Sequence, residues 1–230
     1  MTIAPKRAAS GLRLAMLLAF LPAAATARGA SPSFSQLPLK GLVRKVERSY
    51  NGVRALRAHF VQTYISGGSR RTESGTVLLA RGGRMRWDYL QPQPKLFLSD
   101  GKQVLLYLPS EGQLDRSSVK KSEDYRVPFR LLLTRLHLHK YFSKIKDGGK
   151  ALPHPAEDRV LLGIPKGGAR AGYREVLMEF DPRLNLRRLV ITYTDGSRMD
   201  FHFDQIKRNP PIPPGTFKFH APAGTEIVQE

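Results

Sequence analysis

The feature that most constrains this chain is a two-residue period of apolar side chains, which begins after Gly52 and recurs in short runs. In the first run, Leu56, Ala58 and Phe60 alternate with polar neighbours. Successive side chains of a strand point to opposite faces, so this period predicts strands with one buried face. We predict ten more strands of this kind, at 75–81, 84–90, 95–99, 103–108, 113–119, 142–146, 159–164, 173–180, 186–194 and 197–205, and a last short one at 217–220.

Turn signals separate these runs at short spacing. Asp100-Gly101 and Asp195-Gly196 each stand between two apolar runs, which is a strong signal for a β-hairpin. We find no internal repeat and no alternation of strands with long helices, as a parallel sheet would need. The chain is therefore predicted to be mainly β (α+β), with an antiparallel, meandering sheet of about eleven strands.

Two segments break the two-residue period. Residues 38–50 show a helical period, with Pro38 suited to the first turn and Asn51-Gly52 to the C-terminal end. Residues 127–141 begin with a Val-Pro pair and are rich in leucine, which favours one or two short apolar helices. We therefore expect two or three helices in all.

The first 27 residues have the order of a secretory signal peptide. Lys6, Arg7 and Arg13 form a positive region, residues 14–21 are apolar, and residues 25–27 read Ala-Thr-Ala, a typical cleavage site. A permanent membrane anchor is the competing interpretation, but the apolar run is too short to span a bilayer stably. The sequence predicts export to the periplasm and cleavage after Ala27.

The remaining residues, 28–230, are predicted to form a single domain with a loose N-terminus at 28–37. A domain of this length can bury a substantial core. The chain has no cysteine, so no disulfide can support it, and it cannot carry an N-terminal lipid of its own. We expect the mature protein to be soluble.

The chain is strongly basic, with 38 Lys and Arg against 19 Asp and Glu and a net charge of +19. Such a charge fits either a solvated surface or attraction to an anionic membrane, lipid or protein, and composition does not choose between them. The cations are scattered along the chain instead of forming one run. Together with export, this scatter argues against nucleic acid as the partner.

Signatures of catalysis are hard to find. The chain lacks a cysteine nucleophile, a G-x-S-x-G motif and a phosphate-binding loop. His137 and His139 lack a third ligand at metal spacing, so we assign no metal site. Asp100 and Asp195 are expected to shape their hairpin turns. The sequence predicts no enzyme, no catalytic residue and no cofactor.

Large apolar residues share faces of the predicted strands. Met85, Trp87 and Tyr89 lie on one face of their strand, and Leu105 and Tyr107 share a face of a neighbouring strand. These residues fit either an ordinary sheet core or the wall of a ligand cavity. The alternation alone does not distinguish the two.

A series of motifs carries a family resemblance. In the centre are Ala80 to Tyr89, Gln91-Pro92, Ser99-Asp100-Gly101-Lys102 and Tyr107-Leu108-Pro109; the flanks add 56–62, 127–132 and Phe217-Lys218-Phe219 with Pro222 and Gly224. In this order and spacing they resemble the LolA family of outer-membrane lipoprotein carriers. The likeness runs over most of residues 38–230.

The resemblance implies a strongly curved antiparallel sheet that forms an unclosed barrel, with the helices as a lid over its open side. It also implies a periplasmic chaperone that holds the acyl chains of lipoproteins in a hydrophobic cavity. Such a protein, a monomer, would take lipoproteins from an inner-membrane lipoprotein-releasing ABC transporter and pass them to an outer-membrane acceptor. A module on the same fold that binds lipids or glycolipids, or senses envelope stress, is the alternative.

On this interpretation, the cavity wall consists of five residues: Phe60, Met85, Trp87, Tyr89 and Tyr107. We expect all five on the concave face of the sheet.

The resemblance further implies that Phe129, Leu132 and Leu133 belong to the lid and that Arg81 is linked to lid closure. An arginine presents five donors in a rigid fork and keeps its charge. From the end of its strand, Arg81 is expected to reach carbonyl groups of the lid around 129–133. This chain has Gly82 where the family usually has proline, which should loosen the turn after Arg81.

Overall fold

The structure, a computed structural model, describes residues 1–2, 33–119, 136–151 and 153–229. The helices in these ranges include none that is long and apolar enough to cross a membrane. Phe129, Leu132 and Leu133, the predicted lid residues, lie outside the described residues, as does most of the predicted signal peptide.

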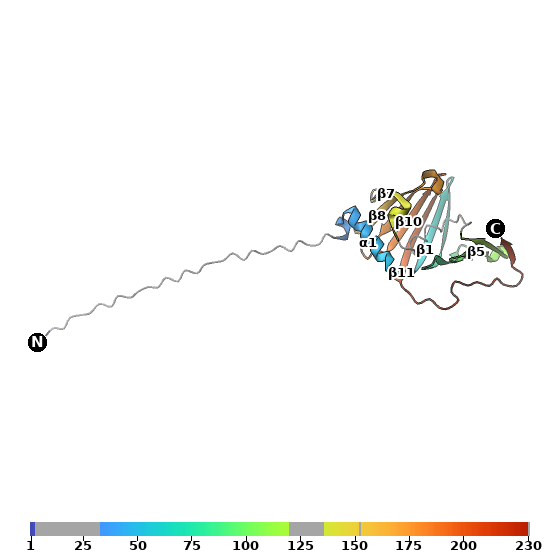
Figure 1. Ribbon diagram of the computed structural model, residues 1–230, viewed down its shortest axis with the longest axis horizontal. Helices are drawn as coiled ribbons and strands as arrows, with labels where there is room; N and C mark the ends of the chain where they lie inside the picture. Colours follow the sequence, from blue (N-terminus) through green and yellow to red (C-terminus); the bar gives the residue numbers. More distant parts are fainter. Residues whose placement is uncertain (3–32, 120–135, 152, 230) are drawn as a thin grey trace. The chain divides into compact units, whose positions relative to one another are not determined.

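Twelve strands form one sheet in the described part of the chain (Figure 1). They are β1 (Ala55–Ser66), β2 (Ser69–Ala80), β3 (Arg84–Gln91), β4 (Lys95–Asp100), β5 (Gln103–Leu108), β6 (Gln113–Ser118), β7 (Phe142–Asp147), β8 (Arg159–Pro165), β9 (Tyr173–Phe180), β10 (Leu186–Tyr193), β11 (Arg198–Arg208) and β12 (Glu226–Gln229). Their order in the sheet is β12-β6-β5-β4-β3-β2-β1-β11-β10-β9-β8-β7.

The predicted antiparallel meander is confirmed. Every neighbouring pair is antiparallel except β12 and β6, which run parallel. The two ends of this order, β12 and β7, are not hydrogen-bonded to each other in the described sheet, so the barrel is unclosed. Asp100 and Asp195 shape their hairpins as expected. The Oδ1 of Asp100 accepts from the backbone N–H groups of Lys102 at 2.7 Å and Gln103 at 2.8 Å, and the Oδ1 of Asp195 accepts from that of Ser197 at 2.8 Å.

The prediction of a strand at 217–220 is wrong. This segment is turn and irregular chain, and the last strand is instead β12. Phe217 and Phe219 pack against a sheet whose strands are already paired. The two-residue period there reflects packing of an irregular segment and not pairing.

The predicted N-terminal helix is confirmed as α1 (Leu39–Asn51), which Pro38 precedes and Gly52 follows. Its buried residues are Leu42, Val43, Val46 and Tyr50, one apolar stripe of helical spacing. The second helical segment contributes α2 (Leu138–Tyr141) within the described ranges. Three short 3₁₀ turns complete the helical elements there: η1 (Phe34–Gln36), η2 (Pro109–Glu111) and η4 (Gly168–Ala171).

The sheet has two unlike faces. The inner face carries the main core cluster, to which β1, β3, β9, β10 and β11 contribute side chains and on which α1 packs. The outer face carries three smaller clusters, around Ala55, Leu98 and Val160. Residues 209–225, which join β11 to β12, run over the outer face of β1–β6 and cover two of these clusters.

Ring contacts show that the sheet curves strongly toward its inner face. Trp87 on β3 and Phe201 on β11 are three strand spacings apart, about 14 Å in a flat sheet. Their ring centroids are nevertheless 5.7 Å apart. A sheet bent around this face, with the two large side chains leaning toward each other, brings the rings together.

Candidate functional site

Four of the five predicted cavity residues lie together on the inner face. Phe60, Met85, Trp87 and Tyr89 belong to one cluster and are each at most 2% exposed. The Phe60 ring meets the Trp87 ring at 4.9 Å and the Tyr89 ring at 5.0 Å, both edge to face. Edge-to-face contacts of this kind stabilise aromatic pairs beyond the area they bury.

Gly75 on β2 makes the close approach of these rings possible. It pairs with Phe60 on one side and with Tyr89 on the other, so it lies directly between the two strands' aromatic residues. A Cβ atom at this position would lie 2.0 Å from the carbonyl oxygen of Asp88. The missing side chain lets β2 and β3 come close while the two rings meet over the glycine.

Tyr107, the fifth predicted cavity residue, is on the opposite face, which corrects our expectation. It pairs with Leu96, and both belong to an outer-face cluster in which Tyr107 packs on Phe219 at 4.9 Å. On the same strand, Val104 and Leu106 contact the inner cluster. Both faces of β5 are apolar, so the alternation alone did not reveal which one is inside.

Helix α1 covers one end of the inner face, beside β8, β10 and β11 (Figure 1). Tyr50 fixes its C-terminal end: the ring packs edge to face on Phe180 at 6.0 Å, and the hydroxyl accepts a 2.9 Å bond from the backbone N–H of Leu186. Burial raises the pKa of Tyr50 to about 12. Arg159 on β8 holds the other end, donating to the carbonyl of Leu37 at 2.8 Å.

Arg81 ties the rim of the sheet to α1. Its Nε donates to the carbonyl of Val53 at 2.9 Å, and its Nη2 donates to the carbonyl of Asn51, the last residue of α1. We expected Arg81 to reach carbonyls around 129–133, which lie outside the described residues. Within the described residues its carbonyl partners are those where α1 ends and the chain turns into β1.

Asn51 extends this connection through its side chain. Its Oδ1 accepts from the backbone N–H of Leu136 at 2.7 Å, and its Nδ2 donates to the carbonyl of Leu136 at 3.1 Å. Glu47, one turn earlier, accepts from the backbone N–H of Leu138 at 2.8 Å. Sequence reasoning missed both residues, because their partners are far along the chain.

A buried polar network interrupts the apolar inner face. Tyr89 donates to Gln62 at 2.9 Å, Gln62 donates to Glu73 at 3.2 Å, and Lys95 donates to Glu73 at 2.7 Å. The Lys95 ammonium also lies 4.3 Å from the centre of the Tyr89 ring. Gln62 and Glu73 face each other in the β1–β2 register, which was not visible in the sequence.

The outer face carries charged groups instead. Arg86 pairs with Asp88 at 2.8 Å, and Arg188 pairs with Asp200 at 2.7 Å. Glu179 is hydrogen-bonded to Asp158, and burial together with this second carboxyl raises the pKa of Glu179 to about 7. Within the described ranges no group of three or more His, Asp or Glu side chains could hold a metal ion.

Comparisons with known proteins agree on one family. The family model for the outer membrane lipoprotein carrier protein LolA matches residues 51–220. An outer-membrane lipoprotein carrier protein of Dechloromonas aromatica is 32% identical over 204 residues, which are 86% of this chain and 93% of that protein. Another, from Bordetella avium, is 29% identical over 225 residues, or 96% and 97% of the two chains.

Among solved structures, an uncharacterized conserved protein from Thermus thermophilus has the same fold. Its TM-score is 0.51 at 14% sequence identity, and the match covers 82% of this chain and 98% of that one. At this identity the likeness concerns the fold alone.

Proposed function

This chain belongs to the LolA family of outer-membrane lipoprotein carrier proteins, and on that basis we propose that the inner face of its sheet binds the acyl chains of its lipoprotein cargo. The protein is a carrier and not an enzyme. The observation that supports the binding site is the inner cluster, where Phe60, Met85, Trp87 and Tyr89 offer one apolar surface. Lys95 and Glu73 lie beside this surface, with the Lys95 ammonium 4.3 Å from the centre of the Tyr89 ring.

The magnitudes explain why a carrier needs such a surface. Each methylene group removed from water contributes roughly 0.8 kcal/mol, so some forty acyl methylenes amount to about 30 kcal/mol. These four side chains pack against one another and are each at most 2% exposed. An acyl chain therefore has to separate them in order to bind. Acyl burial supplies more than enough free energy for that separation.

We further propose that Arg81 acts as the latch that holds α1 against the rim. Hydrogen bonds from a charged donor contribute about 1.5–3 kcal/mol each, so the bonds to Val53 and Asn51 favour the closed form at rest. The free energy of these bonds is smaller than the free energy that acyl burial supplies, so cargo can open the latch. The Arg81→Leu variant should therefore keep its fold and accept lipoprotein, but release it poorly to the acceptor, because the open form keeps its ligand.

A two-step transfer assay tests the latch. Acceptance of a radiolabelled lipoprotein and its delivery to outer-membrane vesicles are measured separately for wild type, Arg81→Leu and Arg174→Leu, an exposed arginine on β9 as the matched control. Loss of the latch bonds should slow delivery by about tenfold or more for Arg81→Leu alone, with normal acceptance. Normal delivery would make Arg81 a structural rim residue.

Binding itself is tested through Trp87, the single tryptophan. Saturation with a fatty acyl probe should change its fluorescence, because the probe has to contact or displace the ring. An unchanged spectrum at saturating probe would remove Trp87 from the binding surface. Mass spectrometry of co-purified material would then show whether the cargo is triacylated protein or a free lipid.

Proteins of this family are periplasmic. In keeping with that location, we propose that residues 1–27 are removed during export and that residues 28–230 form the mature carrier. Its partners would be the inner-membrane lipoprotein-releasing ABC transporter and the outer-membrane acceptor. Mass spectrometry of the protein from the periplasm tests the cleavage site, since a mature chain beginning at Arg28 is expected.

A further inference from the structure

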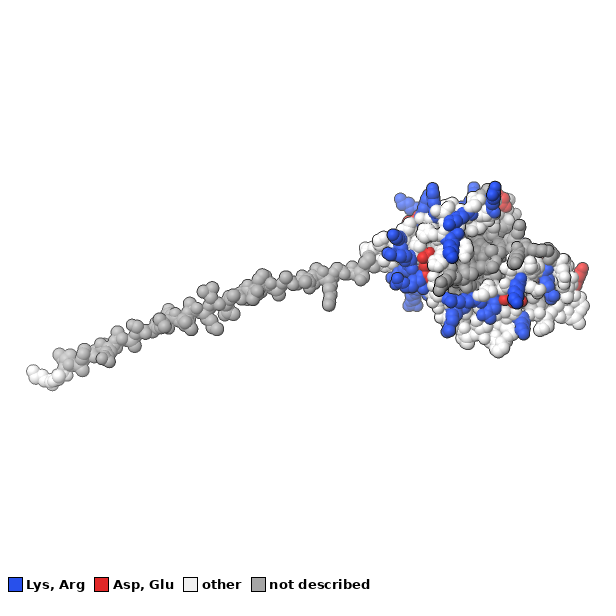
Figure 2. Space-filling model, in the orientation of Figure 1, with Lys and Arg blue, Asp and Glu red and all other residues white. Residues whose placement is uncertain are grey.

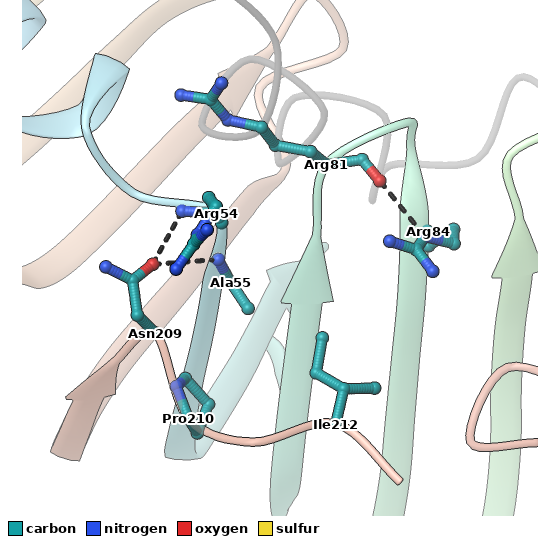
Figure 3. Close-up of a pocket in the computed structure, with 7 residues that line it drawn as sticks. All are labelled: Arg54, Ala55, Arg81, Arg84, Asn209, Pro210 and Ile212. Atoms are coloured by element: carbon teal, nitrogen blue, oxygen red, sulfur yellow. Dashed lines mark hydrogen bonds between the residues drawn. The ribbon is translucent and has the colours of Figure 1, made fainter. Parts of the chain in front are cut away.

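A basic cleft opens on the outer side of the sheet, where β1 begins. Its volume is about 390 Å³. It is lined chiefly by Arg54, Arg81, Arg84, Asn209, Pro210 and Ile212, which come from the start of β1, the β2–β3 turn and the segment after β11 (Figure 3). Ile212 packs with the outer-face cluster around Ala55, so the cleft is separate from the inner face.

The three arginines of the cleft have no acidic partner among the described residues. Some arginines elsewhere on the sheet are neutralised: Arg86 pairs with Asp88 at 2.8 Å, and Arg188 with Asp200 at 2.7 Å. In the cleft, Arg84 donates to the carbonyl of Arg81 and stacks on a phenylalanine ring instead. The Arg81 guanidinium is occupied by the carbonyls of Val53 and Asn51, and its side chain points away from Arg84 (Figure 3). The guanidinium groups of Arg54 and Arg84, which have no counter-ion in the described chain, therefore offer a site for an anion.

A second pair of like charges lies beside the cleft. Arg57 on β1 and Lys207 on β11 are direct partners in the strand register, and both are exposed. Like charges that face each other across two strands destabilise a sheet. Neither forms an ion pair within the described part of the chain. This corner therefore concentrates positive charge, and Figure 2 shows Lys and Arg far outnumbering Asp and Glu on the visible surface.

The cleft also has a fixed amide donor and an apolar floor. The side-chain oxygen of Asn209 accepts from the backbone N–H groups of Arg54 at 2.7 Å and Ala55 at 3.3 Å, which holds the amide in place. Its NH₂ group points away from these bonds (Figure 3). Pro210 and Ile212 supply apolar surface beside it.

We propose that this cleft is a docking site for an acidic segment of a partner protein. A carboxylate lies between Arg54 and Arg84, a backbone carbonyl accepts from the amide of Asn209, and a small apolar side chain packs on Ile212. These three requirements together describe an acidic peptide. A membrane surface would meet the exposed Arg57 and Lys207 but would leave the oriented amide of Asn209 and the half-buried Ile212 unused. The site lies on the opposite face from the proposed acyl site, so docking and cargo binding can be tested independently.

The test is binding of a fluorescent peptide of alternating Glu and Leu to the full mature protein, measured by anisotropy. Charge-assisted hydrogen bonds of this kind are worth about tenfold in affinity. Arg54→Glu, whose side chain makes no bond within the described residues, and Arg84→Glu should each weaken binding about tenfold or more. Lys144→Glu on the edge strand β7 changes the net charge equally and should leave binding unchanged.

A peptide of Gln and Leu should not bind, because it lacks the carboxylates. Equal loss in Arg54→Glu and Lys144→Glu would mean that only net charge matters and would overturn the proposal. So would binding that depends on Arg54 for phosphatidylglycerol vesicles but not for the peptide. Arg54→Glu should still bind the fatty acyl probe normally, which separates this proposal from that of the acyl site.

Discussion

The inner and outer faces of the sheet are built from the same strands but from different chemistry. On β3, Met85 and Trp87 enter a cluster that spans the sheet, whereas Arg84 and Arg86 face outward. The inner face is one large apolar cluster that the Glu73 network interrupts. Among the described residues, Lys95 of that network lies over the Tyr89 ring and Arg208 lies over the Tyr50 ring. The outer face is divided into small clusters with ion pairs between them.

This difference shows where the molecule is prepared to exchange contacts. A large apolar surface can exchange its own contacts for those of an acyl chain with little regard to direction, since apolar burial is non-directional. The outer face cannot, because its charged bonds depend on fixed geometry. Variants on the two faces test this contrast, from the largest expected effect to the smallest.

Truncation of the inner cluster should cost the most. Phe60→Ala removes a fully buried ring that contacts Trp87 and Tyr89. We expect the free energy of unfolding to fall by about 3–5 kcal/mol. Urea unfolding followed by Trp87 fluorescence measures it. The matched variant on the outer face is Phe219→Ala, whose ring is only partly buried, with an expected loss of about 1–2 kcal/mol. Equal losses would mean that the two faces contribute alike.

Gly75→Ala tests the close approach of β2 and β3 beneath the rings. The added Cβ would press on the carbonyl of Asp88, so the strands have to shift. We expect a loss of about 1–3 kcal/mol in thermal or urea unfolding. Gly41→Ala in α1 is the control, because the nearest neighbour of its added Cβ is 3.9 Å away and alanine favours helix by up to about 1 kcal/mol. An unchanged free energy of unfolding in Gly75→Ala would show that β2 and β3 can move apart without cost.

The carboxyl pair on the outer face should make stability depend on pH. The pKa of Glu179 is about 7, above its ordinary value, so the unfolded chain gives up this proton first as pH rises. Stability should therefore fall between about pH 4.5 and pH 7, by on the order of 2 kcal/mol. Glu179→Gln should flatten this fall, whereas Glu111→Gln, an exposed carboxyl, should not. Parallel profiles of the wild type and Glu179→Gln over that range would refute this contribution.

The smallest effect should come from Tyr107, which the sequence had suggested for the cavity. Because it lies on the outer face, Tyr107→Ala should leave affinity for a fatty acyl probe essentially unchanged. Met85→Ala on the inner face should weaken it about tenfold. Both affinities are read from Trp87 fluorescence. A large loss of affinity in Tyr107→Ala would mean that part of the binding surface lies on the outer face of the sheet.

Much of the fold could be predicted from periodicity. Helix α1 and strands β1 to β11 appear where the periods of 3.6 and two indicated them, because a half-buried element needs one apolar face, whereas β12 was not predicted. The positions of Phe60, Trp87 and Tyr89 followed for the same reason: each strand's polar alternation left one possible inner face.

The prediction for Tyr107 was wrong because β5 is apolar on both faces. Which of its residues point to the inner face depends on the β4–β5 register and not on composition. The ties between Asn51 and Leu136, and between Gln62 and Glu73, need the folded chain to bring the partners together. The basic cleft could not be predicted from the sequence for a related reason. Its arginines are scattered along the chain, and only the sheet gathers them at one corner.

The segment that joins β11 to β12 has a mechanical consequence. Residues 209–225 cross the back of β1–β6 and end in a strand that pairs with β6, so they act as a strap on the convex side. Arg86 on β3 attaches this segment to the sheet by donating to the carbonyl of Thr216 at 3.2 Å. A strap of fixed contour length resists further bending of the part it spans. The arm from β10 to β7 carries no such strap in the described chain, so the sheet should flex asymmetrically, with one stiff arm and one compliant arm.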